Sequence, residues 1–311
     1  MTHDDHNPSG AAPARAHANE SSDGAFEPEG VSPSSMRPLD PQPHDFGNIS
    51  APRQFDAGIS NDLRVPWGWH EVLLFVILGI IGTGLITYGL GSLAVRVFHV
   101  NAADVFGSAI TTPKAVVVLI SQALLDAGAI GYLYLMVLQR TSAPFWPTIG
   151  WRGLRAEPGK LRATALQFLA GGAVLALAVT IAGAFLNPKE NLPIDELLKA
   201  PVSMFLFAVL GVLVAPLVEE TIFRGFLYPV IARRAGVTAG IVLTGTLFGL
   251  MHAAQLWGGW GQIALLILVG LVLTWVRART GTVAASYLVH LGYNGLQLIG
   301  YVFYIIGGLR H

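Results

Sequence analysis

The chain has 311 residues, of which 53% belong to the hydrophobic set AVILMFWYC and only 12% are charged, and its mean hydropathy is +0.56. Soluble globular proteins carry roughly twice this charged fraction. The composition therefore argues against a water-soluble enzyme and favours an integral membrane protein. The sequence has no cysteine, which excludes disulfides, thiol nucleophiles and thiolate metal sites.

The formal net charge of zero conceals two regions of opposite sign. Residues 1–70 contain ten acids and four bases (4 − 10 = −6), and residues 71–311 contain nine acids and fifteen bases (15 − 9 = +6). A basic balance in an apolar chain points to anionic membrane lipid rather than to nucleic acid. We therefore expect membrane lipid as a partner and no nucleic acid.

Residues 1–66 have the composition of a disordered polar tail. They are rich in Pro, Ser, Ala, Gly, Asp and His and contain few large aliphatic residues. Such a segment cannot bury enough apolar surface to offset the entropy cost of ordering it. It also lacks the apolar stretch of a secretory signal peptide. We divide the chain into this tail, residues 1–66, and a transmembrane region, residues 67–311.

Long gaps between charged residues predict the helices of the transmembrane region. A spanning helix needs about 20 apolar residues. The longest gap holds 42 residues between Arg234 and Arg277; as one helix it would be about 60 Å long, so it must fold back. The glycines at positions 258, 259 and 261 offer the turn. The gaps predict an all-α, polytopic bundle with about seven spans, at approximately 72–95, 115–138, 163–186, 202–230, 237–256, 262–277 and 283–307.

Three details of this bundle follow from single residue types. Pro216 predicts a kink in the fourth span, or its division into two pieces and hence an eighth element. Ten Lys and Arg residues lie in loops on one side and five on the other, which predicts a cytoplasmic amino terminus in the cell membrane. Gly245 and Gly249 predict the close approach of another helix, as do Gly225 and Gly292. Nothing in the sequence indicates an oligomeric state.

Polar side chains at membrane depth are costly and indicate function by default. In the fourth span, Glu220 and Arg224 are four residues apart and can pair along one helical face. This pairing neutralises one carboxylate and leaves Glu219 to face the bundle interior as a candidate general base. A purely structural ion pair is an equally good interpretation of Glu220 and Arg224.

Three further polar residues complete the set. His252 lies in the fifth span, and His290 and Asn294 lie four residues apart in the seventh, so the last two emerge on one face. That spacing suits two donors to one oxygen or two ligands of one metal. Each residue alone is equally consistent with hydrogen bonding between helices, but together with Glu219 they indicate one site.

The segments Glu219–Arg224, Phe248–His252 and His290–Asn294 match the motifs EExxxR, FxxxH and HxxxN. Over roughly residues 200–295 the sequence resembles the CPBP family of intramembrane proteases. This family includes CAAX prenyl endopeptidases, bacteriocin-processing and immunity proteins, and lysostaphin-resistance-type proteins.

The resemblance implies a helical membrane endopeptidase that acts on a peptide or protein substrate at the membrane. It implies Glu219 as the catalytic glutamate and His252 as its partner. Glu220 and Arg224 complete the first motif, and His290 and Asn294 form the third. The resemblance does not say whether the substrate is prenylated.

Two mechanisms fit these residues. In one, Glu219 and His252 activate a water while His290 and Asn294 stabilise the oxyanion, with no cofactor. In the other, His252, His290 and Glu219 bind zinc, which activates the water. Asn294 suits an oxyanion donor better than a zinc ligand, and the HExxH zinc helix is absent, so we favour the metal-free mechanism.

Two other classes of protein remain as alternatives. A membrane transporter would place a Glu/His/Arg relay at mid-membrane, with its polar groups strung along a path. A catalytically inactive scaffold or immunity protein of the same family would keep the fold with relaxed site geometry. Asp126, in the middle of the second span, also needs a polar partner, and we expect it near Arg224 or a site histidine.

Overall fold

The computed structural model describes residues 60–154, 160–186 and 201–308, all of which belong to one compact unit spanning residues 54–311. The described residues form helices and connecting segments and no strand. The predicted disordered tail lies outside the described residues, apart from residues 60–66. The division of the chain at residue 66 therefore stays a prediction.

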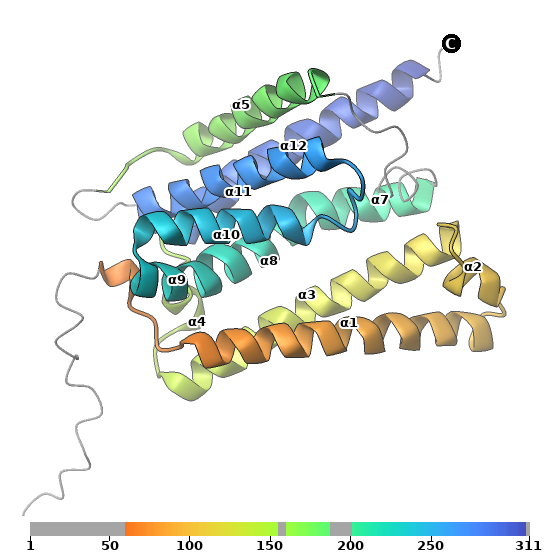
Figure 1. Ribbon diagram of the computed structural model, residues 1–311, viewed down its shortest axis with the longest axis horizontal. Helices are drawn as coiled ribbons and strands as arrows, with labels where there is room; N and C mark the ends of the chain where they lie inside the picture. The colour runs from red at the N-terminus through yellow and green to blue at the C-terminus, as the bar shows by residue number, and fades with distance from the viewer. Residues whose placement is uncertain (1–59, 155–159, 187–200, 309–311) are drawn as a thin grey trace, which may run out of the picture. The chain divides into compact units, whose positions relative to one another are not determined.

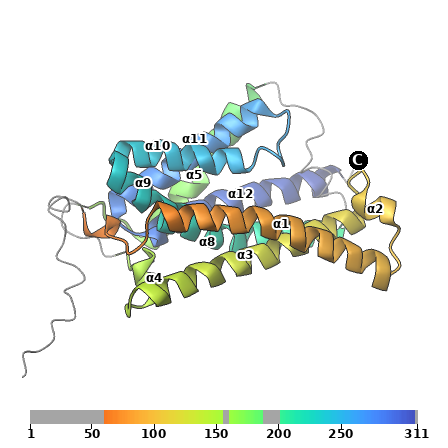
Figure 2. The same cartoon turned by 60° about the horizontal axis from the view of Figure 1, so that its bottom comes forward.

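The described helices run mainly along one direction and pack as neighbouring pairs (Figures 1 and 2). In the first pair, a short helix connects the two long helices. The members of the second pair are far apart in the sequence, and the third pair is a helical hairpin. These pairs are α1 (Trp69–Val97) with α3 (Thr112–Arg140) through α2 (Ala102–Phe106), α5 (Ala165–Ala184) with α12 (Val283–Gly308), and α10 (Val237–Met251) with α11 (Trp260–Thr280). A short helix, α4 (Phe145–Thr148), follows α3.

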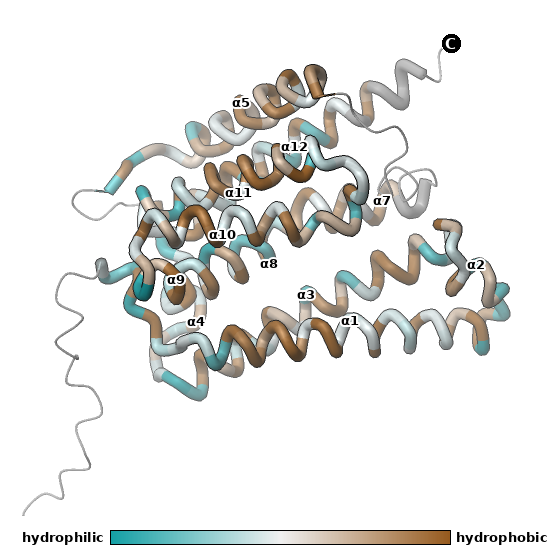
Figure 3. Tube along the Cα trace, viewed as in Figure 1, coloured by the Kyte–Doolittle hydropathy of each residue, from teal (hydrophilic) through white to brown (hydrophobic). Residues whose placement is uncertain are grey.

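Each predicted span coincides with helical structure, so the prediction of a helical membrane bundle is confirmed. In the described part of the chain, five helices are long and apolar enough to cross a membrane, and α10 is a shorter apolar helix of 15 residues. Figure 3 shows that the long helices are mostly hydrophobic, while hydrophilic residues gather at the end of the bundle near α4 and α9 (Tyr228–Ala235). The cytoplasmic orientation of this end stays a prediction.

The fourth span is one continuous helical run that contains two π-helical segments. It comprises α7 (Pro201–Val209), the π-helical segment η3 (Leu210–Val214), α8 (Ala215–Glu220), the π-helical segment η4 (Thr221–Leu227) and α9 (Tyr228–Ala235). Pro216 follows η3 and Pro229 follows η4. Because proline donates no backbone N–H and its ring crowds the preceding turn, a local π adjustment accommodates it inside a membrane helix. Pro216 therefore does not divide the span.

Glycines bring neighbouring helices into backbone contact, as predicted. A Cβ added at Gly245 would lie 2.6 Å from the Leu271 nitrogen, and one at Gly249 would lie 2.6 Å from the Ile267 nitrogen, both on α11. Gly225 faces the carbonyl of Ile149, and Gly292 faces the carbonyl of Leu169 on α5. The predicted approach of another helix is confirmed at Gly245, Gly249 and Gly292, whereas Gly225 meets the loop that follows α4.

Gly172 on α5 lies against the backbone carbonyl of Val289 on α12, with no room for a side chain. We expect Gly172→Val to lower the free energy of unfolding by about 3 kcal/mol, since overpacking against backbone cannot be relieved by a rotamer change. Thermal unfolding in detergent micelles measures this. The adjacent Gly171 has open space around it, so Gly171→Val is the control. Equal losses in both variants would contradict the packing argument.

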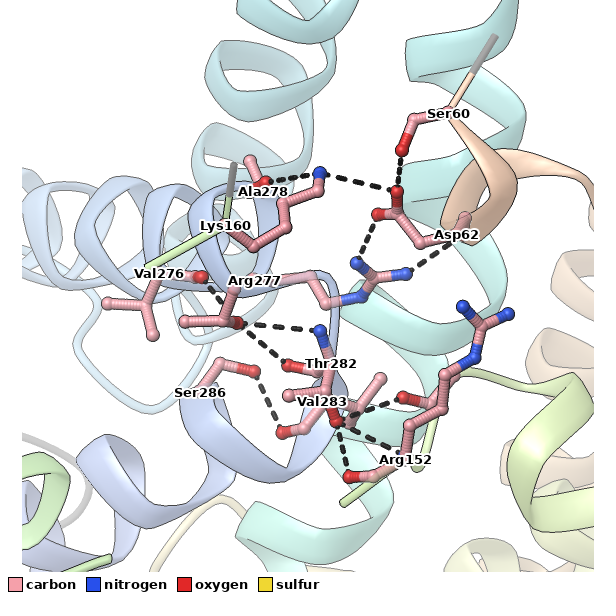
Figure 4. A network of polar contacts seen from close by, with 12 residues as sticks. Ser60, Asp62, Arg152, Lys160, Val276, Arg277, Ala278, Thr282, Val283 and Ser286 are labelled. Atoms are coloured by element: carbon pink, nitrogen blue, oxygen red, sulfur yellow. Dashed lines mark hydrogen bonds and ion pairs between the residues drawn. The ribbon is translucent and has the colours of Figure 1, made fainter. Parts of the chain in front are cut away.

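Residues 60–67 fasten the start of the membrane region to the ends of α9 and α11. The turn η2 (Asn61–Leu63) carries Asp62, whose carboxylate accepts a hydrogen bond from Arg277 Nη1 at 2.7 Å and lies 3.3 Å from Lys160 Nζ (Figure 4). The Asp62 carbonyl accepts a second bond from Arg277 Nη2 at 3.0 Å. Asp62 and Arg277 are both buried, so this ion pair ties two parts of the chain together away from water.

Burial alone would raise the pKa of Asp62, but Arg277, the Ser60 hydroxyl and Lys160 together lower it from 3.8 to about 2. The ionised form thus stabilises the fold fully above pH 4, and the contribution is lost as the pH falls from about 4 to 2. We expect Asp62→Asn to cost about 3 kcal/mol at neutral pH, because Arg277 stays buried without its partner.

Thermal unfolding as a function of pH tests this expectation. The parent should lose stability between pH 4 and 2, and Asp62→Asn should lack this part of the loss. Asn61→Ala, at the exposed neighbouring position, is the control. If Asp62→Asn unfolds at the parent's temperature at neutral pH, the ion pair does not stabilise the fold.

Candidate active site

Three helices bring one glutamate and two histidines together. Glu219 lies at the end of α8, His252 directly follows α10, and His290 lies in the second turn of α12. One carboxylate oxygen of Glu219 is 3.8 Å from His252 Nε2, and the other is 3.7 Å from His290 Nε2. The carboxylate of Glu219 therefore lies between the two rings.

Glu220 and Arg224 form the buried ion pair that the i,i+4 spacing predicts. Arg224 Nη1 donates to Glu220 Oε1 at 2.8 Å, and both side chains are 0% exposed. The same carboxylate oxygen lies 3.0 Å from His290 Nδ1. Glu220 therefore links the guanidinium to the imidazole, whereas Glu219 keeps 18% of its side chain exposed and His252 keeps 19%.

The hydrogen bonds of the two rings fix which nitrogen of each faces Glu219. His252 Nδ1 lies 2.9 Å from the Phe248 carbonyl and His290 Nδ1 lies 3.0 Å from the Glu220 carboxylate. A carbonyl or carboxylate oxygen only accepts, so each Nδ1 carries a hydrogen. Each Nε2 is thus directed at Glu219, free to accept a proton or, in an imidazolium, to donate one.

Phe248 packs among the charged groups of the site. Its ring lies 4.4 Å from the Arg224 guanidinium carbon and contacts the rings of His252 and His290, with centroids 5.1 and 5.6 Å away. A guanidinium over an aromatic face gains cation–π attraction. Phe248 therefore stabilises the buried cation and holds both imidazoles in place.

Asn294 and Asp126 are placed differently from the other predicted residues. The Asn294 amide donates to the carbonyl of Gly211 in η3 at 2.8 Å, a contact that the sequence did not suggest. Asp126 accepts a hydrogen bond from Gln122 at 2.8 Å and interacts electrostatically with Glu219. The predicted position of Asp126 near Arg224 or a site histidine stays a prediction.

The residues of the zinc alternative are not grouped as a zinc site in this arrangement. Two ligands of one tetrahedral zinc lie about 3.3 Å apart, given metal–ligand distances near 2.0 Å, whereas the Nε2 atoms here lie 3.7 and 3.8 Å from the Glu219 oxygens. Across the described ranges, His, Asp and Glu side chains form no group of three that could hold a metal ion. The expectation of a metalloprotease-like site is therefore not supported.

Comparison with known proteins identifies the segment that carries these residues. Residues 201–296 match a family model described as Rce1-like, type II CAAX prenyl endopeptidase Rce1-like. Over these residues the chain is similar to the CPBP/CAAX protease family. No curated protein and no solved structure matches the chain. The matched segment contains Glu219, His252, His290 and Asn294. The first three of these are the residues that the structure brings together.

The structure adds residues to this site that the motifs did not reveal. Thr274 on α11 accepts a hydrogen bond from Arg224 Nε at 3.2 Å, and the Gly270 carbonyl accepts one from Nη2 at 3.0 Å. Ser286 on α12 is fully buried and interacts with the Glu220 carboxylate. Ser286 precedes His290 by four residues, so it shares a face with it, and this spacing was visible in the sequence.

We expect Arg224→Gln to reduce the free energy of unfolding by about 4 kcal/mol, because it leaves the Glu220 carboxylate buried without its cation. The double variant Glu220→Gln/Arg224→Gln should lose less, since neither charge remains. Thermal unfolding in detergent measures both. A double variant less stable than the single one would show that the two side chains do not act as a pair.

Proposed function

We propose that the chain is an intramembrane endopeptidase of the CAAX type, acting on a membrane-associated peptide through a water activated by Glu219. The observation that carries the proposal is the position of the Glu219 carboxylate between the Nε2 atoms of His252 and His290. Glu219 and His252 are partly exposed, which leaves room beside them for the water of the proposal, while Glu220, Arg224 and His290 are almost fully buried.

In this proposal Glu219 is the general base. A water between Glu219 and His252 gives its proton to the Glu219 carboxylate, and His252 Nε2 accepts its second hydrogen bond and orients it. The resulting hydroxide attacks the carbonyl carbon of the scissile peptide bond. Glu219 then passes the proton to the leaving amine as the tetrahedral intermediate collapses.

His290 stabilises the negative oxygen of this intermediate. It lies beside two carboxylates, Glu219 and Glu220, and only one guanidinium, Arg224, balances them. In the imidazolium form, Nε2 of His290 carries the hydrogen that an oxyanion needs. Asn294 uses one amide hydrogen on the Gly211 carbonyl. In the proposal its second amide hydrogen is donated to the oxyanion, because Asn294 lies one turn from His290 on the same face of α12.

The alternatives make different demands on this geometry. A transporter relay needs polar groups distributed along a path, whereas Glu219, Glu220, Arg224, His252 and His290 gather at one point. An inactive scaffold has no need of two histidines directed at one carboxylate. The convergence therefore favours hydrolysis.

The test is cleavage of an internally quenched peptide that ends in a farnesylated cysteine followed by three residues. We expect Glu219→Ala and His252→Ala to lower kcat/KM by at least about 100-fold, the usual contribution of a general base. Asp104→Asn on α2 and His70→Ala at the start of α1 are controls of matching residue type away from the site. Equal cleavage by the parent and the two site variants would refute the enzyme proposal.

Two further arms of this assay refine the proposal. Retained cleavage after exhaustive chelation supports the metal-free mechanism, while loss that zinc restores would overturn that mechanism and keep the hydrolase. The same peptide without the farnesyl group shows whether the lipid is part of the substrate.

A further inference from the structure

A loop between α4 and α5 joins the two helices on which the site depends. Gly150 accepts a hydrogen bond from the backbone N–H of Val283, the first residue of α12, at 2.9 Å. Arg152 N donates to Thr282 Oγ1 at 3.1 Å, and that hydroxyl donates to the Arg152 carbonyl at 2.7 Å (Figure 4). The loop is therefore fastened to the start of the helix that carries His290.

The other side of the same loop lies against η4. The carbonyl of Ile149 approaches Gly225 so closely that a Cβ there would lie only 2.5 Å from it. Trp151 Nε1 donates to Thr221 Oγ1 at 2.9 Å, and Thr221 directly follows Glu220. The Thr221 hydroxyl in turn donates to the Leu217 carbonyl at 2.7 Å, so the indole is connected to the turn that carries Glu219 and Glu220.

One side chain, Trp151, contacts both helices. Its indole N–H binds Thr221, and its ring packs on Tyr287 of α12 with centroids 5.2 Å apart. Tyr287 precedes His290 by three residues, about one helical turn. Trp151 thus connects a residue adjacent to Glu220 with a residue one turn from His290.

Two short contacts within the site depend on how far apart α8 and α12 lie. Glu220 lies 3.0 Å from His290 Nδ1 and Glu219 lies 3.7 Å from His290 Nε2, so the separation of α8 and α12 sets both contacts. A displacement of about 1 Å in such an arrangement can cost about 100-fold in rate. Because π-helical segments are rare and occur mostly as single-turn bulges inside α-helices, we expect η4 to depend on contacts from outside the helix to keep Glu220 in position.

We propose that Trp151 is a positioning residue for the reaction, which fixes the separation between the glutamate-bearing turn and His290 without touching the reacting atoms. Its effect on rate rests on the proposed endopeptidase function, whereas its effect on the two helices does not. The substitution Trp151→Phe keeps an aromatic ring against Tyr287 and removes the N–H that binds Thr221.

The chain offers a matched control at the far end of η4. Trp67 Nε1 donates to the Phe226 carbonyl at 3.0 Å and its ring packs against Phe226 at 5.8 Å. Trp67→Phe therefore removes an equivalent indole bond to the same π-helical segment, at the end remote from Glu220.

The first experiment is hydrogen–deuterium exchange of the full-length protein in detergent micelles, read by mass spectrometry on peptides that cover residues 217–227 and 283–292. We expect Trp151→Phe to accelerate exchange at least about threefold in both peptides, because opening of the two helices becomes less costly. Trp67→Phe should accelerate only the first peptide. Unchanged exchange in residues 283–292 of Trp151→Phe would overturn the proposal, whatever the outcome of the cleavage assay.

The second experiment measures kcat and KM on the farnesylated peptide, normalised to the folded fraction. Trp151→Phe and Thr221→Val should each lower kcat about tenfold with KM within about twofold, as expected for displaced catalytic groups. Their double variant should lose no more than either single one, because both remove the same hydrogen bond. Additive losses, or an equal kcat loss in Trp67→Phe, would overturn the positioning role. No cleavage by the parent would refute the proposed function, and exchange would still decide the role of Trp151.

Discussion

The ion pair between Glu220 and Arg224 is the interaction around which the other polar groups of the bundle are arranged. Both groups are completely buried among apolar helices, where an uncompensated charge would be very costly. Arg224 also donates hydrogen bonds to the Gly270 carbonyl and the Thr274 hydroxyl of α11, and Glu220 also binds His290 of α12. The requirement that every buried charge be satisfied thus fixes three helices relative to one another, and it leaves Glu219 as the carboxylate that is free to act.

Much of this arrangement could be predicted from local sequence spacing. The four-residue interval between Glu220 and Arg224 predicts their pairing, gaps between charges predict the helices, and Gly245 and Gly249 predict the contact with α11. These features depend on helical periodicity and on the absence of side chains, which are properties of a few neighbouring residues. That Glu219 lies beside both His252 and His290 was inferred from motif order and is observed in the geometry.

Other features depend on the meeting of distant segments and left no local signal. Asp62 lies in a stretch whose composition predicts disorder, yet it is buried because Arg277, 215 residues away, needs a counter-ion. Asn294 donates a hydrogen bond to the backbone carbonyl of Gly211. This contact depends on the path of η3 past α12 and not on the residues near Asn294 in the sequence. Trp151 is one of seven tryptophans in the sequence, and nothing in its neighbourhood indicates that its indole reaches Thr221.

The two π-helical segments affect how this helix tolerates changes in length. A π turn closes one residue later than an α turn, so η4 holds about one residue more than ordinary pitch would require. Loss of one residue inside Thr221–Leu227 would be absorbed by tightening the turn, and α9 would keep its place beside Asn61–Leu63. A deletion between Glu220 and Arg224, however, would shorten their interval to three residues and rotate the guanidinium away from Thr274 and Gly270. The interval between these two charges is therefore constrained by the contacts of Arg224 with Glu220 and with α11, and not by the length of the helix.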